Sequence, residues 1–140
     1  MLDRKKRVYV YTLLDVYSRW VYAWASPKAN CSQSLSFVYQ TKEILPSNLS
    51  CLQSDNGSEF SQHFTERIKI KHRHSRVRGP NDNAHLERFN RTLQEELLDS
   101  LPNNVEIINQ VLPKYLQYYN TERLHLGLKL KTPSQVMPSY

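Results

Sequence analysis

The sequence lacks the features that mark secreted, metal-caged or membrane-spanning proteins. Its two cysteines, Cys31 and Cys51, form no CxxC pair, so neither a zinc cage nor a disulfide framework is expected. No apolar run approaches the roughly 18 residues of a membrane span, and the N-terminus lacks the apolar segment of a signal peptide. Internal repeats, low-complexity segments and flexible linkers are also missing. We therefore expect one soluble, cytoplasmic domain over residues 1–140.

Positively charged residues are in excess, because the sequence has 19 Lys and Arg and only 13 Asp and Glu, which gives a net charge of +6. This balance suits a nucleic-acid partner, although basic surfaces also occur on proteins that bind none. A group of five cations lies between 69 and 78, in a predicted edge strand at 70–77 and the loop after it. Its members are Lys69, Lys71, Arg73, Arg76 and Arg78. We expect this segment to contact DNA. His72 and His74 also lie there, and without further ligands we interpret them as basic surface.

Hydrophobic patterning predicts a β-hairpin near the start of the chain. Residues 8–14 form a nearly continuous run of β-branched and aromatic side chains, which is typical of a buried strand. A turn at 15–18 leads into the second arm at 19–25. The tyrosines and tryptophans of the two arms are interpreted as packing residues of a sheet, in preference to a platform for stacking bases.

The middle of the chain is predicted to alternate helices and strands. A helix is expected over 32–45, capped by Ser32 or Asn30, and a short strand over 49–54. A second short helix is expected over 59–68, where Phe60, Phe64 and Ile68 recur every four residues. This order of elements predicts an α/β fold.

A long amphipathic helix is predicted within 79–97. Its apolar residues recur at spacings of three, four and four, which places them on one stripe of a helix. They are Leu86, Phe89, Leu93 and Leu97. Glu87 lies beside this stripe on a half-exposed edge, together with Arg91 and Gln94.

A last helix is predicted over 105–119, after a break at 101–104. The residues expected to face the core are Ile108, Val111, Leu112, Tyr115, Leu116 and Tyr119. Pro113 inside this pattern predicts a kink, or a helix made of two pieces.

Two carboxylates on different elements are candidates for metal binding. Asp55 follows the strand predicted at 49–54, at the carboxyl edge where α/β sheets form their active sites, and Glu87 lies 32 positions further on. Attack on a phosphodiester develops charge on two oxygens, which two cations roughly 4 Å apart can stabilise when carboxylates hold them. Taken singly, an Asp before Asn-Gly is usually a turn residue, and a helical Glu is usually solvated.

Four sequence blocks then occur in order along nearly the whole chain. They are T-L-L-D-V-Y-S-R-W-V-Y-A (12–23), S-D-N-G-S-E-F (54–60), N-D-N-A-H-L-E-R-F-N-R-T-L-Q-E-E (81–96), and Y-Y-N-T-E-R-L-H-L-G-L with T-P-S-Q-V (118–136). Together they resemble the catalytic core of the DDE transposase and retroviral integrase superfamily, in particular bacterial insertion-sequence transposases. The resemblance implies an RNase H-like fold, in which helices flank a mixed sheet.

The same resemblance assigns roles to particular residues. It implies that Asp55 is the second catalytic carboxylate and Glu87 the third, and that both bind Mg²⁺ or Mn²⁺ in a two-metal site when the carboxylate triad is complete. It also implies DNA contacts for Asn90, Arg91 and Gln94, for which ordinary surface is the alternative, and the basic loop adds Arg76 and Arg78.

The activity implied is divalent-metal-dependent DNA strand cleavage and transfer. The implied partners are transposon ends, target DNA and further copies of the chain, in a bacterial cytoplasm at the nucleoid and away from membranes. The chain offers no helix-turn-helix for specific end recognition, so salt-sensitive, non-specific DNA binding is expected.

The chain departs from the family pattern at its N-terminus. The family's first carboxylate lies on a strand before the hairpin, whereas here only seven residues precede that hairpin. Asp3 is the only acid among them and is not favoured as the missing ligand, because Arg4 and the basic residues after it resemble the turn itself. Asp15 matches a position that is not a ligand and is interpreted as a turn residue. We therefore expect an N-terminally truncated transposase that lacks the first, central strand, with an in-frame or frameshifted continuation in the DNA upstream.

Two other functions remain open at this point. One is an inactive remnant that binds DNA non-specifically or assembles with other copies. The other is an RNase H-type nuclease of RNA·DNA hybrids, which the transposase-like block at 81–91 disfavours.

Overall fold

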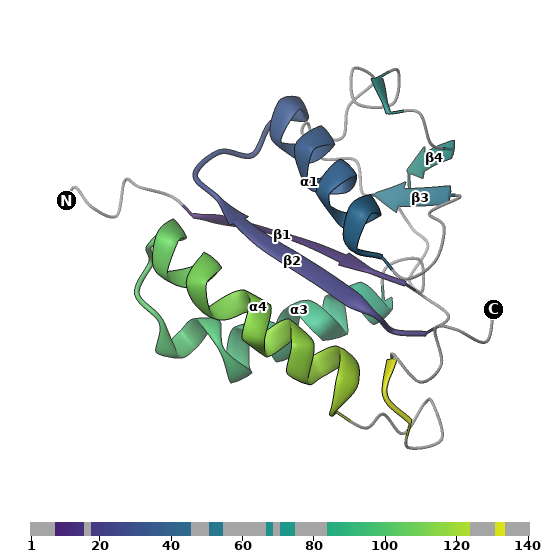
Figure 1. Ribbon diagram of the computed structural model, residues 1–140. Coiled ribbons are helices and arrows are strands. Elements are labelled where there is room, and N and C mark those ends of the chain that lie inside the picture. The colour runs from purple at the N-terminus through teal and green to yellow at the C-terminus, as the bar shows by residue number, and fades with distance from the viewer. Residues whose placement is uncertain are drawn as a thin grey trace. The chain divides into compact units, whose positions relative to one another are not determined.

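The computed structural model describes residues 8–15, 18–45, 51–54, 67–68, 71–74, 84–123 and 131–133, with 51–54 and 71–74 as backbone alone. The elements follow in the order β1 (Tyr9–Leu14), β2 (Val21–Ser26), α1 (Cys31–Ile44), β3 (Cys51–Ser54), β4 (Lys71–His74), α3 (Ala84–Glu96), the 3₁₀ helix η3 (Leu98–Ser100) and α4 (Val105–Thr121) (Figure 1). The chain divides into two compact units. Residues 1–27 and 85–140 form the first unit, and residues 28–84 form the second.

In the first unit, β1 and β2 form the predicted antiparallel hairpin, with a register that runs from Tyr9 opposite Ser26 to Leu14 opposite Val21. The turn between them is built on Asp15, whose Oδ2 accepts hydrogen bonds from the backbone N–H (2.8 Å) and the hydroxyl (2.7 Å) of Ser18. These bonds confirm Asp15 as a turn residue. The second strand begins later than expected because residues 18–20 belong to the turn.

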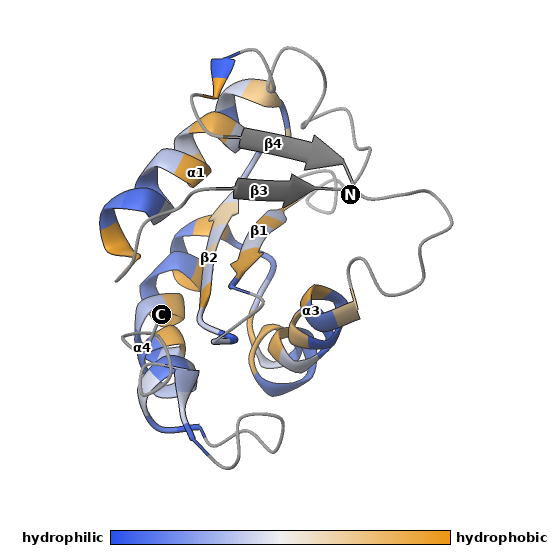
Figure 2. Cartoon of the chain, turned by 90° about the vertical axis from the view of Figure 1, so that its right-hand side faces the viewer, coloured by the Kyte–Doolittle hydropathy of each residue, from blue (hydrophilic) through white to orange (hydrophobic). Residues whose placement is uncertain are grey.

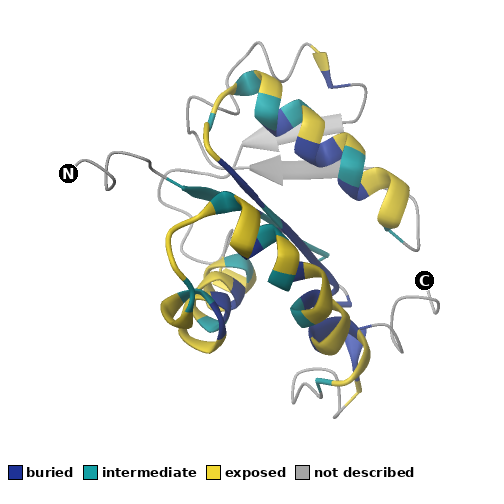
Figure 3. Ribbon diagram, turned by 60° about the vertical axis from the view of Figure 1, so that its left-hand side comes forward, coloured by how far each residue is buried: buried dark blue, intermediate teal, exposed yellow. Residues whose placement is uncertain are grey.

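Helix α4 packs along β2. The side chain of Asn104 caps it by accepting the Ile107 N–H at 3.1 Å. Of the residues predicted to face the core, four are buried: Ile108, Leu112, Leu116 and Tyr119. Figure 3 shows β2 as an almost continuously buried strand, and α4 with its other side exposed. The burial therefore confirms most of the predicted inner face.

Of the two outcomes predicted for Pro113, a helix in two pieces is wrong, because α4 is one continuous helix from Val105 to Thr121, and a kink stays a prediction. Proline deprives the carbonyl of the residue four positions earlier, Asn109, of its usual helical partner. Pro113 itself is exposed, while its neighbour Leu112 is fully buried. The apolar contacts on the inner side therefore outweigh the loss of one helical hydrogen bond.

Two asparagines of α4 bind the backbone of β2 directly. Asn120 accepts the N–H of Val21 and donates to its C=O, both at 2.9 Å, and Asn109 does the same for Ala25 at 2.8 and 2.9 Å. Val21 and Ala25 lie an even number of residues apart, so both point their polar groups to the side away from β1. Eleven helical residues span about 16 Å and four strand residues about 13 Å, so the two pairs match in length.

Helix α3 matches the predicted amphipathic pattern. Phe89 and Leu93 are buried on its inner side, Leu97 is buried just after its end, and Leu86 is half-buried. The Phe89 ring meets the Tyr119 ring edge to face, with centroids 5.1 Å apart, and so joins α3 to α4. Figure 2 shows hydrophobic and hydrophilic residues segregated around both helices.

The second unit contains α1 and the parallel pair β3 and β4, whose register runs from Cys51 opposite Lys71 to Ser54 opposite His74. Asn30 is the cap of α1, since its side chain accepts the Gln33 N–H at 2.9 Å. The predictions of strands at 49–54 and 70–77 are confirmed over 51–54 and 71–74, while the rest of both ranges and most of the helix predicted at 59–68 lie outside the described residues.

The strands form two separate two-stranded sheets within the described ranges, one antiparallel and one parallel. Residues 1–7 are not among the described residues, so the expected loss of a first central strand stays a prediction. None of the helices described here has the length and apolar character needed to cross a membrane.

Candidate functional site on helix α3

Glu87, the predicted third carboxylate, lies in the first turn of α3. Its side chain is exposed, and within the described part of the chain it forms no ion pair. The apolar stripe that contains Phe89 and Leu93 anchors the helix beneath it. Glu87 is therefore an accessible carboxylate on a fixed backbone, at a helix end whose dipole favours negative charge.

Asp55, the predicted second carboxylate, lies outside the described residues. Strand β3 ends at Ser54, so Asp55 directly follows a strand, as predicted. It belongs to the second unit and Glu87 to the first. Among the residues whose side chains are described, no group of three or more His, Cys, Asp or Glu could hold a metal ion. The pairing of Asp55 with Glu87 stays a prediction.

The residues predicted to contact DNA are only partly described. Asn90, Arg91 and Gln94 are all exposed on α3. Gln94 is engaged locally, because its Nε2 donates to Asp99 Oδ1 at 2.6 Å. Arg76 and Arg78 are outside the described ranges, and the DNA role of all five residues stays a prediction.

A basic cluster formed by Arg19, His85 and Arg88 escaped the sequence-based prediction. Partial burial, and then the positive charges of Arg19 and Arg88, hold the pKa of His85 below its ordinary value of 6.5. Arg19 comes from the hairpin turn and the other two from the start of α3, so no local pattern links them. Two of the blocks that suggested the family contain them, but without indicating their proximity.

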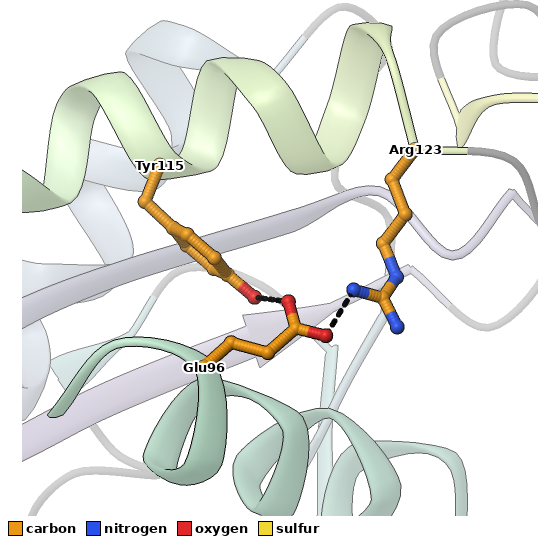
Figure 4. A network of polar contacts seen from close by, with 3 residues as sticks. All are labelled: Glu96, Tyr115 and Arg123. Carbon is orange, nitrogen blue, oxygen red and sulfur yellow. Dashed lines mark hydrogen bonds and ion pairs between the residues drawn. The ribbon is translucent and has the colours of Figure 1, made fainter. Parts of the chain in front are cut away.

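A second polar group joins the far end of α3 to α4 (Figure 4). The hydroxyl of Tyr115 donates to Glu96 Oε1 at 2.8 Å, and the Arg123 guanidinium forms an ion pair with Glu96 Oε2. Burial alone would raise the pKa of Glu96, but the hydrogen bonds from Arg123 and Tyr115 outweigh it and lower the pKa. Arg123 also lies over the Tyr119 ring, 5.5 Å from its centroid.

This group is expected to contribute stability that depends on pH. Because the pKa of Glu96 in the folded chain lies below 4.5, its contribution is full above that pH and is lost as the pH falls through the folded value. The Glu96 side chain is 37% exposed. We therefore expect Glu96→Gln to lower the free energy of unfolding by only about 0.5–1 kcal/mol at neutral pH.

Urea unfolding at neutral pH and well below pH 4.5 checks this expectation, since the two proteins should converge in acid. Glu95→Gln is the matched control on the same helix and should have no effect at either pH. A difference at Glu96 that persists in acid would show that packing, and not the charge, is responsible.

Comparison with known proteins agrees with this architecture. The integrase catalytic core of bovine immunodeficiency virus has the same fold, with a TM-score of 0.71 at 20% identity, over 93% of this chain and 85% of that one. The HTLV-2 integrase catalytic core domain, solved in complex with magnesium, gives a TM-score of 0.68 at 25% identity. The match covers 91% of this chain and 83% of that one. A chain of the simian T-cell lymphotropic virus intasome, solved in complex with the PP2A regulatory subunit B56 gamma, gives a TM-score of 0.73 at 22% identity. The match covers 91% of this chain and 47% of that one. The fold is therefore the RNase H-like fold of integrase catalytic cores.

Two family models described as the integrase core domain match the sequence, one over residues 1–80 and the other over 68–133. The chain belongs to the integrase core domain family, and so to the DDE transposases and integrases.

The curated relatives of this chain are proteins of mobile elements and a virus. It is 27% identical to the transposase for insertion sequence element IS904 of Lactococcus lactis, over 90% of this chain and 53% of that protein. It is 26% identical to a putative integrase of Spiroplasma virus SpV1-C74, over 96% of this chain and 43% of that protein. It is also 27% identical to the putative transposase InsK for IS150 of Escherichia coli, over 91% of this chain and 48% of that protein. The chain spans about half the length of these relatives.

Proposed function

We propose that this chain is the catalytic core of a DNA transposase, in which Asp55 and Glu87 hold divalent cations for DNA strand cleavage and transfer. The observation that carries the proposal is Glu87, an exposed carboxylate in the first turn of an anchored helix, within the block that resembles the family. Support also comes from relatives whose names state transposase or integrase.

The carboxylate of Glu87 is a suitable ligand for the proposed metals, Mg²⁺ and Mn²⁺. Mg²⁺ and Mn²⁺ prefer oxygen ligands, and the Glu87 carboxylate is exposed and forms no ion pair within the described ranges. The bound ions would supply charge stabilisation to the attacking and leaving oxygens of the phosphodiester. The role of the chain itself is to fix the carboxylates, which α3 does for Glu87 through the packing of Phe89 and Leu93.

The proposed partners follow from the same activity. Transposon ends and target DNA would be bound non-specifically through Asn90, Arg91 and Gln94 on α3 and through Arg76 and Arg78. Self-association is proposed because strand transfer joins two DNA ends, and the HTLV-2 core has been solved in dimeric and trimeric forms. The site of action would be the bacterial nucleoid.

The test measures metal binding and chemistry separately. Mn²⁺ binding to the full chain is followed by electron paramagnetic resonance, for the wild type and for Asp55→Ala. Strand joining is followed on gels, with Mn²⁺ and labelled DNA that carries the terminal repeats flanking this reading frame, alongside an RNA·DNA hybrid. We expect Asp55→Ala to remove a Mn²⁺ site, and we expect joining to require both Asp55 and a complete carboxylate triad.

Three results would contradict the proposal. If DNA is retained, but neither Mn²⁺ binding nor cutting depends on Asp55, the chain is a DNA-binding module. If the hybrid is cleaved and the DNA duplex is not, it is a nuclease of RNase H type. If Mn²⁺ binds through Asp55 without any joining, the carboxylate site stands and strand transfer by this chain does not.

A further inference from the structure

The hairpin turn and the start of α3 bring Arg19 and Arg88 to the same end of α4. Two residues after Arg19, the backbone of Val21 is bound on both its polar groups by Asn120. Directly after Arg88, the ring of Phe89 contacts the ring of Tyr119 at 5.1 Å. Asn120 and Tyr119 are successive residues of one helix, so these contacts fix both arginines near a common point.

The two arginines at this point are not held in ion pairs by the described part of the chain. Neither Arg19 nor Arg88 forms an ion pair there, whereas Arg123 is paired with Glu96. Arg88 is exposed and Arg19 is half-exposed, so both can reach a ligand. The first turns of α3, which contain Arg88, add the positive end of the helix dipole.

The backbone at Arg19 shows that the turn itself does not need an arginine. Its φ of 67° is in the left-handed region, and it is the only non-glycine residue with positive φ among those described. That conformation is unfavourable for a residue with a Cβ, and glycine adopts it without this cost. What arginine adds at this position is therefore its side chain and charge.

We propose that Arg19 and Arg88 together bind the phosphodiester backbone of DNA beside Glu87. Guanidinium groups suit phosphate oxygens because they can donate two parallel hydrogen bonds. Arg88 is the neighbour of Glu87 on α3, so a strand bound here passes next to the proposed metal-binding carboxylate. The inference rests on the proposed function for its choice of DNA, and it assigns contacts to two residues outside the set already proposed.

The experiment measures the affinity of the full chain for a fluorescent DNA duplex by anisotropy, in EDTA and over a series of salt concentrations. Arg19→Gly and Arg88→Gln are each expected to weaken binding about tenfold near 0.1 M salt, and to reduce the slope of log K against log salt by about 0.9. Lys114→Gln, which removes an exposed cation from α4, is the matched control and should have a much smaller effect. Thermal unfolding is measured for every variant.

The variant Arg19→Gly separates binding from folding. Because glycine relieves the left-handed backbone, this variant should unfold at the same temperature as the wild type or higher, while it loses DNA affinity. Wild-type affinity in both arginine variants, an equal loss in Lys114→Gln, or no DNA binding by the wild-type chain would each overturn the inference. Since the assay contains no metal, its outcome is separate from the Mn²⁺ site, which Asp55→Ala tests.

Discussion

Replacing Glu87 with glutamine is expected to weaken Mn²⁺ binding about a hundredfold or more, and to lower the rate of strand joining about a thousandfold where the carboxylate triad is complete. Glutamine keeps the size of the side chain but removes the anionic oxygens that a divalent ion prefers. Losing even an outer partner of a metal ligand commonly reduces affinity 10- to 100-fold, so the loss of a ligand should cost at least as much. A thousandfold in rate corresponds to about 4 kcal/mol of charge stabilisation at the phosphodiester.

The same variant should leave the stability of the fold unchanged, because Glu87 is exposed and has no ion pair within the described residues. Glu95→Gln makes the identical change two turns further along α3, at another exposed position, and should retain metal binding. Metal titration and urea unfolding of both variants check these statements. Equal Mn²⁺ affinity in the two variants would remove Glu87 from the metal site.

Replacing Asn120 with leucine is expected to lower the free energy of unfolding by about 3–5 kcal/mol. Asn120 is 6% exposed, and its amide satisfies both the N–H and the C=O of Val21. Leucine fills a similar volume but leaves both backbone groups buried without these partners. Each such group costs about 1–3 kcal/mol, and the two costs add because one side chain supplied both bonds. Urea unfolding at constant pH measures the difference.

Asn109 provides the matched comparison, since its amide makes the same pair of bonds to Ala25 at a partly buried site. Water can replace the lost partner there, so Asn109→Leu should cost only about 1 kcal/mol. Equal losses at the two positions would show that burial does not set the contribution of this contact. A loss below 1 kcal/mol at Asn120 would show that the backbone of Val21 finds other partners.

The sequence predicted those parts of the fold that repeat with a regular period. The hairpin, α1, α3 and α4 all follow apolar patterns, because burial of a stripe or of a strand is the main favourable term that forms them. Pro113 is the informative failure. A proline inside a helix favours a break because it removes a backbone hydrogen bond, but the burial of Leu112 and Leu116 keeps α4 a single helix. Tertiary contacts of that kind cannot be read from a window of neighbouring residues.

The candidate site was predicted less completely, for a similar reason. Glu87 was proposed as a site residue because it stands beside a periodic stripe and within a recognisable block. The structure shows that it is exposed on α3, and its role stays a prediction. Arg19 and Arg88 were missed because their proximity depends on how the hairpin turn and α3 pack against α4. The asparagines that bind β2 were missed as well, since an asparagine within a helix carries no sign of a distant backbone partner.

The two asparagine contacts have a consequence for how this protein behaves in concentrated solution. A strand with unbound amides along one side is a template on which a second molecule can add its own strand, and repeated addition produces fibrils. Side-chain amides already occupy that side of β2 at Val21 and Ala25. By imitating the peptide groups of a neighbouring strand, the two asparagines of α4 thus occupy the backbone groups of Val21 and Ala25 with which such a strand would pair.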